Sequence, residues 1–191
     1  MTQPYYQDRL FELVPCSPNQ TREIVDSVLN LTQVAIDMAD VKRVPRYNKQ
    51  SRENNAEHSY MLTLVAAEIA RTHFPYLDDG LVSKFASVHD LPELETGDVA
   101  TFHQTTEQAN YKTFSEKLAL QALRKRLPRY TFELLERYEA QIEPEARLVR
   151  FIDKLLPVAV DILGPGSMVM HEDYKVLTHH ELDRGEQALR E

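Results

Sequence analysis

The chain has little of what several protein classes require. Its 191 residues include one cysteine, Cys16, and no tryptophan. A single cysteine excludes an internal disulfide framework and a thiolate zinc cage, and it is expected to be an unpaired thiol in a reducing compartment. No apolar run approaches the ~18 residues of a membrane span, and residues 1–8 lack the basic and apolar segments of a secretion signal. We therefore expect a soluble, cytoplasmic protein with no membrane partner.

Basic residues are also in deficit. Lysine and arginine number 22 against 30 aspartates and glutamates, which gives a formal net charge of −8, and the basic residues are scattered along the chain. A protein that follows a nucleic-acid backbone usually gathers its basic residues into a stripe. Polymeric nucleic acid is therefore not an expected partner, whereas a small anion in a metal-bearing pocket is compatible with this charge.

Glycine is scarce, with five in the chain, and long stretches carry apolar residues at three- and four-residue spacing. These features predict an all-α fold: one domain over residues 1–191, built as a bundle of about six to eight helices with its core at about 18–163. The expected helices are about Pro18 to Ala39, Ala56 to His73, from Leu81 onward, Glu107 to Leu127, Tyr130 to Gln141, Pro144 to Leu163 and a peripheral one at 175–190.

The first helix has a clear start signal. Ser17 precedes Pro18, and Gln20 completes a capping box with Ser17. Its apolar stripe is predicted to face the core and consists of Ile24, Val28, Leu31, Ala35 and Met38.

Prolines mark the expected interruptions. The polar segment Val41 to Asn54 contains Pro45 and is predicted to be an irregular loop, and the sequence offers no obvious strand. Pro92 predicts a kink or a helix end just after His89 and Asp90, and Pro157 predicts a kink in a buried helix.

Ionisable side chains occur where the predicted helices are otherwise apolar. His58 lies on one such helix, the pair His89 and Asp90 ends the next, and Asp153 lies within a third. Because an unpaired buried charge is expensive, a cation is expected near the carboxylates. Two imidazoles and two carboxylates form a mixed nitrogen and oxygen set that suits Zn²⁺, Mn²⁺, Fe²⁺ or Co²⁺.

The order and spacing of these residues resemble the HD-domain superfamily of metal-dependent phosphohydrolases, and within it the small bacterial 5′-deoxynucleotidases. The similarity covers roughly Asp40 to Leu163. The matching motifs are Arg43 with Pro45, the block E-N-x-x-E-H-S from Glu53 to Ser59, the block H-D-x-x-E-x-x-T-G-D from His89 to Asp98, and Asp153 with Lys154.

This resemblance implies roles for the ionisable residues of the motifs. One divalent cation (Co, Mn, Zn, Fe or Mg) would be held by His58, His89, Asp90 and Asp153, with further positions left open for water and substrate, since four ligands alone would close the site. Glu93 would be the catalytic acid or base and Arg43 would bind the phosphate. The remaining implied roles are sugar binding by Asp98 and support of the site by Glu57, Glu53 and Lys154, which would orient His58, hold the arginine segment and balance the carboxylates.

The resemblance implies hydrolysis of 2′-deoxynucleoside 5′-monophosphates to deoxynucleoside and phosphate by a homodimer. Two departures affect the substrate: Val44 stands where the family has a bulky aromatic residue, and Ser51 where it has an arginine. A deoxynucleoside triphosphate triphosphohydrolase is the alternative enzyme, because further cations lie nearby, at Lys42, Arg46, Lys49 and Arg52. The alternative outside enzymes is a helical protein that uses its metal as a ligand sensor or for stability.

Overall fold

The protein is described by a computed structural model for residues 16–46, 51–97, 115 and 118–163. The elements are α1 (Pro18–Asp40), β1 (Lys42–Arg46), β2 (Arg52–Asn54), α2 (Asn55–His73), α3 (Asp79–Val88), α4 (Glu93–Thr96), α6 (Arg129–Ala140) and α7 (Pro144–Leu163), and residues 118–126 are also helical. The predicted all-α fold is confirmed. Within these ranges no helix is long and apolar enough to cross a membrane.

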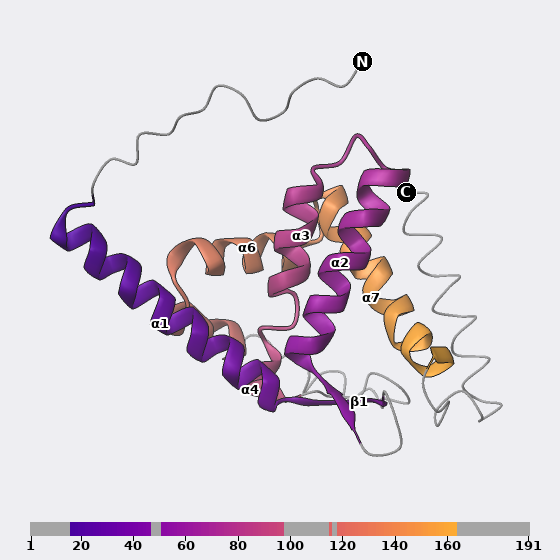
Figure 1. The fold of residues 1–191 in the computed structure, drawn as a ribbon, viewed down its shortest axis with the longest axis horizontal. Helices are drawn as coiled ribbons and strands as arrows, with labels where there is room; N and C mark the ends of the chain where they lie inside the picture. Colours follow the sequence, from indigo (N-terminus) through magenta and orange to yellow (C-terminus); the bar gives the residue numbers. More distant parts are fainter. Residues whose placement is uncertain (1–15, 47–50, 98–114, 116–117, 164–191) are drawn as a thin grey trace.

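Helices α2, α3 and α7 pack against one another at the centre of the molecule (Figure 1). Helix α2 turns Leu62, Ala66 and Ala70 inward at four-residue spacing, and all three are fully buried. The two alanines let neighbouring helices approach closely because they carry only a methyl group. Phe85 of α3 and Ile152 of α7 complete this core. The centre of the fold is therefore a three-helix contact on which α6 and the ribbon also pack.

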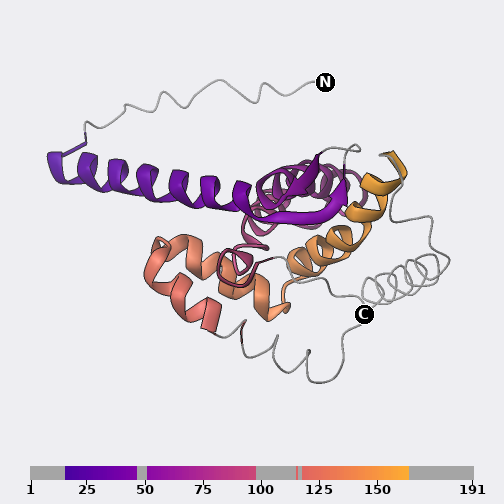
Figure 2. The ribbon, with the colours of Figure 1, turned by 90° about the horizontal axis from the view of Figure 1, so that it is seen from below.

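Helix α1 begins as predicted. The hydroxyl of Ser17 accepts a hydrogen bond from the backbone of Gln20 at 3.3 Å, and the Gln20 side chain accepts one from the Ser17 backbone at 2.8 Å. Its stripe was expected in the core, and that prediction is wrong for most of the helix: Val28 is 59% exposed, and Met38 is the stripe member that is buried. The reason is that the first half of α1 extends away from α2 and α3 (Figures 1 and 2).

Residues 41–54 were expected to form an irregular loop, and this prediction is also wrong. Strands β1 and β2 form a two-stranded antiparallel ribbon, with Lys42 opposite Asn54 and Arg46 opposite Arg52. Pro45 lies where the register shifts between Lys42 and Arg46, and proline is confined in sheets to such irregularities and to edge strands because it has no N–H to donate. The ribbon brings β1 against α7, and it leads directly into α2.

Helix α3 begins at a cap and ends before the proline. The carboxylate of Asp78 accepts a hydrogen bond from the backbone of Leu81 at 3.0 Å. The helix ends at Val88, so His89 and Asp90 lie in a turn, and Pro92 precedes the short helix α4. A helix end was expected at Pro92, and α3 ends earlier, at Val88; Pro92 has no N–H with which to bond the Val88 carbonyl four residues before it. Helix α7 matches its expected bounds and contains Pro157.

Candidate metal centre

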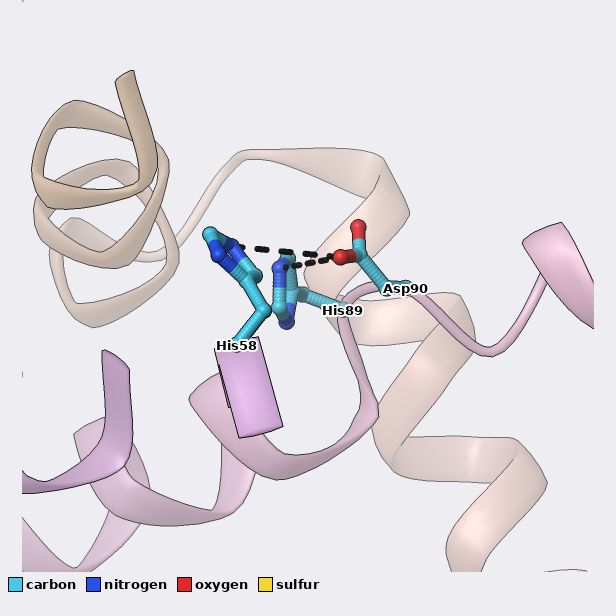
Figure 3. A group of neighbouring side chains, drawn as sticks. All are labelled: His58, His89 and Asp90. Atoms are coloured by element: carbon cyan, nitrogen blue, oxygen red, sulfur yellow. Dashed lines mark ion pairs between the residues drawn. The ribbon is translucent and has the colours of Figure 1, made fainter. Parts of the chain in front are cut away.

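Three side chains form a cluster suited to a metal ion at the junction of α2 with the turn after α3. One nitrogen each of His58 and His89 and one oxygen of Asp90 lie within 4.8 Å of one another (Figure 3). His89 Nε2 lies 3.0 Å from Asp90 Oδ2, and His58 Nε2 lies 3.9 Å from the same oxygen. The three groups therefore face a common point from two elements that are distant in sequence.

Asp153 of α7 adds a second carboxylate beside this cluster. Its Oδ1 lies 3.0 Å from His58 Nε2 and 3.6 Å from His89 Nε2. Helix α7 reaches this position because Leu148, Ile152 and Leu156 bury one face of it, and Asp153 follows Ile152 by one residue. Lys154 Nζ lies 3.5 Å from Asp153 Oδ2 and is 43% exposed, so it partly balances the carboxylate from the solvent side.

Hydrogen bonds of the two histidines leave their Nε2 atoms facing the cluster. His58 Nδ1 lies 2.6 Å from Glu53 Oε1, and both side chains are completely buried. His89 Nδ1 lies 2.9 Å from the carbonyl oxygen of Ala86. Because a carboxylate and a carbonyl can only accept, each Nδ1 carries the hydrogen, and each Nε2 is left able to coordinate a metal.

The buried Nε2 of His89 has no hydrogen-bond partner of suitable geometry among the described residues, although Asp90 Oδ2 is near it. An unsatisfied buried polar atom is costly unless something occupies the space in front of it. The carboxylates of Glu53, Asp90, Glu93 and Asp153 also carry more negative charge than Arg43 and Lys154 balance. The donor set and the charge balance both fit a divalent cation.

Histidine and aspartate perturb each other's ionisation strongly here. Burial alone would lower the pKa of His89, but the carboxylates of Asp90 and Asp153 outweigh it and raise this pKa to about 10. Burial also opposes the charged form of His58, and Asp153 with Glu53 nevertheless raises its pKa. Burial would raise the pKa of Asp153, yet the two histidines hold it well below its usual range. Protons on the histidines thus compensate the carboxylates when no metal is bound.

Arg43 of β1 lies at the edge of the cluster and contacts three acidic side chains. Its Nη1 lies 2.6 Å from Asp90 Oδ2 and 3.7 Å from Glu93 Oε2, and its Nε lies 3.3 Å from Glu53 Oε1. The Arg43 side chain is 11% exposed. The ribbon that was not predicted from the sequence is what carries this arginine to the site.

Glu93 reaches the site although the helix does not continue through Pro92. It begins α4, and its Oε2 accepts a hydrogen bond from Asn55 Nδ2 at 2.7 Å. The turn after α3 replaces the continuous helix that would have aligned Glu93 with Asp90. Asp98, expected near a sugar, lies outside the described residues.

The supporting residues differ in detail from those expected. Glu53 contacts both His58 and Arg43, whereas the exposed Glu57 caps α2: its carboxylate accepts from the Asn54 backbone at 3.1 Å. Sequence reasoning missed Asn55, which is fully buried between Arg43 and Glu93. It also missed Tyr138 of α6, whose buried ring packs edge-on against His89 at 6.1 Å between centroids. Two consecutive asparagines at a helix start, Asn54 and Asn55, were a weak signal for Asn55. No local feature of the sequence marked Tyr138.

The model of the HD domain family matches residues 38–186 of the chain. The chain belongs to this family. It is 30% identical over 132 residues to the 5′-deoxynucleotidase HDDC2 of Bos taurus, and 29% identical over 124 residues to that of Homo sapiens. The alignments cover 65% and 61% of this chain, and the chain spans only 63% and 59% of the length of these relatives. The family resemblance inferred from the motifs is confirmed.

Solved structures share the fold of this HD domain at low sequence identity. One is a predicted metal-dependent phosphohydrolase from Magnetospirillum magnetotacticum MS-1. It superposes with a TM-score of 0.68 at 20% identity, covering 91% of this chain and 86% of that one. The HD phosphohydrolase DatZ of cyanophage S-2L, bound to dA and one catalytic Zn²⁺ ion, superposes with a TM-score of 0.54 at 22% identity, covering 82% of each chain. These likenesses show the fold.

Proposed function

We propose that this HD-domain protein is a metal-dependent phosphohydrolase that cleaves 2′-deoxynucleoside 5′-monophosphates to deoxynucleoside and phosphate. The observation that carries the proposal is the meeting of Arg43 and Glu93 beside the cluster of His58, His89 and Asp90. A purely structural metal site has no need of an arginine and a glutamate at its edge. The names of the HDDC2 relatives support the substrate class.

The metal would be held by His58, His89, Asp90 and Asp153, whose donor atoms face one another from α2, the turn after α3, and α7. A divalent cation with open positions supplies Lewis-acid stabilisation of a phosphoryl group and a water-derived nucleophile near neutral pH. The mixed ligand set accepts Co²⁺, Mn²⁺, Zn²⁺, Fe²⁺ or Mg²⁺, so availability decides the ion.

Arg43 and Glu93 have separate proposed roles, phosphate binding and proton transfer. A guanidinium donates two parallel hydrogen bonds to a phosphate, and Arg43 sits within reach of the cluster, where a phosphate would exchange for its present carboxylate partners. Glu93 would take a proton from the attacking water or give one to the leaving oxygen of the sugar. Asp98 is proposed to accept a hydrogen bond from the sugar 3′-hydroxyl.

The test is a substrate comparison with metal-reconstituted protein. Stripped protein is reloaded in turn with Co²⁺, Mn²⁺, Zn²⁺ or Mg²⁺ and given deoxynucleoside monophosphates, ribonucleoside monophosphates and deoxynucleoside triphosphates, and phosphate and triphosphate are separated by chromatography. Phosphate release from the deoxymonophosphates alone, lost in Glu93→Ala, is the expected result. Release of triphosphate would mean that the substrate is a deoxynucleoside triphosphate and that the protein is a triphosphohydrolase. No turnover with any metal would favour the sensor or structural role.

We also propose that the protein acts as a homodimer that covers the outer face of α1. The supporting observation is a set of large apolar side chains left exposed along this helix: Ile24, Val25, Val28, Leu29, Leu31 and Ile36. Contiguous exposed apolar surface of this kind commonly marks a protein contact. Light scattering coupled to size exclusion should give twice the mass of 22.1 kDa, and Val28→Glu with Leu29→Glu should give the monomer. A monomeric wild-type chain would contradict the proposal.

A further inference from the structure

Asn55 joins the two side chains that flank the metal cluster. It is the first residue of α2 and is fully buried. Its Nδ2 donates a hydrogen bond to Glu93 Oε2 at 2.7 Å, and its Oδ1 accepts one from Arg43 Nη1 at 3.4 Å. One amide therefore bridges α4 and β1, two elements with no covalent connection near the site.

The chemistry of the neighbours determines which way the amide faces. A carboxylate can only accept and a guanidinium can only donate, so the NH₂ group must face Glu93 and the carbonyl oxygen must face Arg43. The reversed amide would bring oxygen to oxygen and nitrogen to nitrogen. Aspartate at this position would lack the donor that Glu93 needs. An apolar side chain would lack both the donor and the acceptor.

The backbone of Asn55 is held as firmly as its side chain. Its N–H donates to the carbonyl oxygen of Val41 at 3.1 Å, next to the start of β1. The preceding residue, Asn54, caps α2: its side chain accepts from the backbone of Glu57 at 3.0 Å. With backbone and side chain both fixed, Asn55 is a rigid reference point, as an accurate catalytic constellation requires.

We propose that Asn55 is a positioning residue that holds the Glu93 carboxylate and the Arg43 guanidinium in register beside the metal cluster. The inference rests on the proposed phosphohydrolase function. The amide has two arms with separate effects. The donor arm, Nδ2, orients the proton-handling Glu93 and acts on kcat. The acceptor arm, Oδ1, orients the phosphate-binding Arg43 and acts on KM. Neither arm touches the four proposed metal ligands.

Three variants separate the arms. Asn55→Asp keeps the shape and the acceptor toward Arg43 but places a carboxylate against Glu93, so kcat should fall roughly 10- to 100-fold while KM changes less than about threefold. Asn55→Leu removes both arms, so KM should rise as well. Asn54→Asp is the matched control, because it makes the same change one residue earlier and aspartate also caps a helix well. Its kcat should stay within about threefold of the wild type.

A reciprocal exchange tests the contact without relying on catalysis. Asn55→Asp should lower the melting temperature, since two carboxylates then face each other. Adding Glu93→Gln should restore most of the loss, because the exchange returns one donor and one acceptor to the pair. Additive losses would mean that the Asn55 amide and the Glu93 carboxylate do not interact. The metal content of every variant is measured alongside, so that a fall in kcat is separated from a loss of metal.

The outcomes are distinct. A selective fall in kcat for Asn55→Asp, normal metal content and recovery of the melting temperature on exchange support the positioning role. An active wild type whose Asn55→Asp variant keeps its kcat, or whose melting-temperature losses add, overturns the inference and leaves the proposed function standing. A wild type without turnover on any nucleotide overturns the proposed function and the positioning role together.

Discussion

Glu53 Oε1 lies 2.6 Å from His58 Nδ1 in the buried interior, and the same oxygen lies 3.3 Å from Arg43 Nε. One carboxylate thus orients a proposed metal ligand and the proposed phosphate-binding arginine. Because it accepts from Nδ1, it leaves His58 Nε2 facing Asp153 and Asp90, and it makes the imidazole a stronger donor to a metal that displaces the Nε2 proton.

Glu53→Gln should therefore weaken metal binding. The amide oxygen can still accept from His58, but it carries no charge, so the imidazole becomes a poorer ligand and affinity should drop about 10- to 100-fold. Titration calorimetry with Co²⁺ or Zn²⁺ measures this directly. Glu68→Gln, on the exposed side of α2, serves as the control. Equal affinities for wild type and Glu53→Gln would show that the contact does not tune the ligand.

Metal binding should stabilise the fold. A ligand at 100 times its dissociation constant adds about 2.7 kcal/mol to the free energy of unfolding, which for a chain of this size raises the melting temperature by roughly 5–10 °C. The rise should vanish in Asp153→Ala, which removes the oxygen nearest to His58 Nε2. Differential scanning fluorimetry with chelator and with added metal measures the rise in melting temperature for the wild type and for Asp153→Ala. A similar rise in Asp153→Ala would place the bound ion elsewhere.

Arg43 should contribute to phosphate binding through its fork geometry and not through charge alone. A hydrogen bond to a charged group is worth about 1.5–3 kcal/mol, so Arg43→Ala should lower kcat/KM roughly 10- to 100-fold. Arg43→Lys should recover little of this loss, since an ammonium cannot donate the two parallel bonds. Steady-state kinetics on the best substrate provides the measurement. Full activity in Arg43→Lys would show that Arg43 contributes only its positive charge and not its fork geometry.

Metal uptake should release protons and strengthen with rising pH. In the metal-free chain the pKa of His89 is raised to about 10 and that of His58 is raised, while the pKa values of Asp90 and Asp153 are lowered. Near neutral pH the histidines therefore carry protons that a metal must displace, whereas the carboxylates are already ionised. Apparent affinity should rise by up to about tenfold per pH unit for each proton released.

Calorimetry in buffers of different ionisation enthalpy counts these protons. One to two per metal, on the order expected for two imidazole ligands, are predicted between about pH 7 and 9. His89→Gln should release fewer. A count of zero, with affinity independent of pH, would mean that the histidines are neutral before the metal arrives.

Local features of the chain were sufficient to predict most of the helices. The capping box of Ser17 and Gln20, a helix end before Pro92 and the bounds of α7 all depend on residues within a few positions of one another, and the structure has each of them. The stripe on α1 shows where this fails. Apolar periodicity marks a face that prefers burial, but it does not say whether another element lies against that face, and for most of α1 none of the described elements does.

The sequence by itself determined the helical elements, the family and the ionisable residues from which a metal site can be built, since periodicity, capping and motif order are written along the chain. Only the tertiary structure decided that β1 carries Arg43 to Asp90, that Glu53 contacts His58, and that Asn55 lies between Arg43 and Glu93. Contacts of this kind join β1, β2, α2, α4 and the turn after α3. Their distances depend on how these elements pack, which no spacing within a single element specifies.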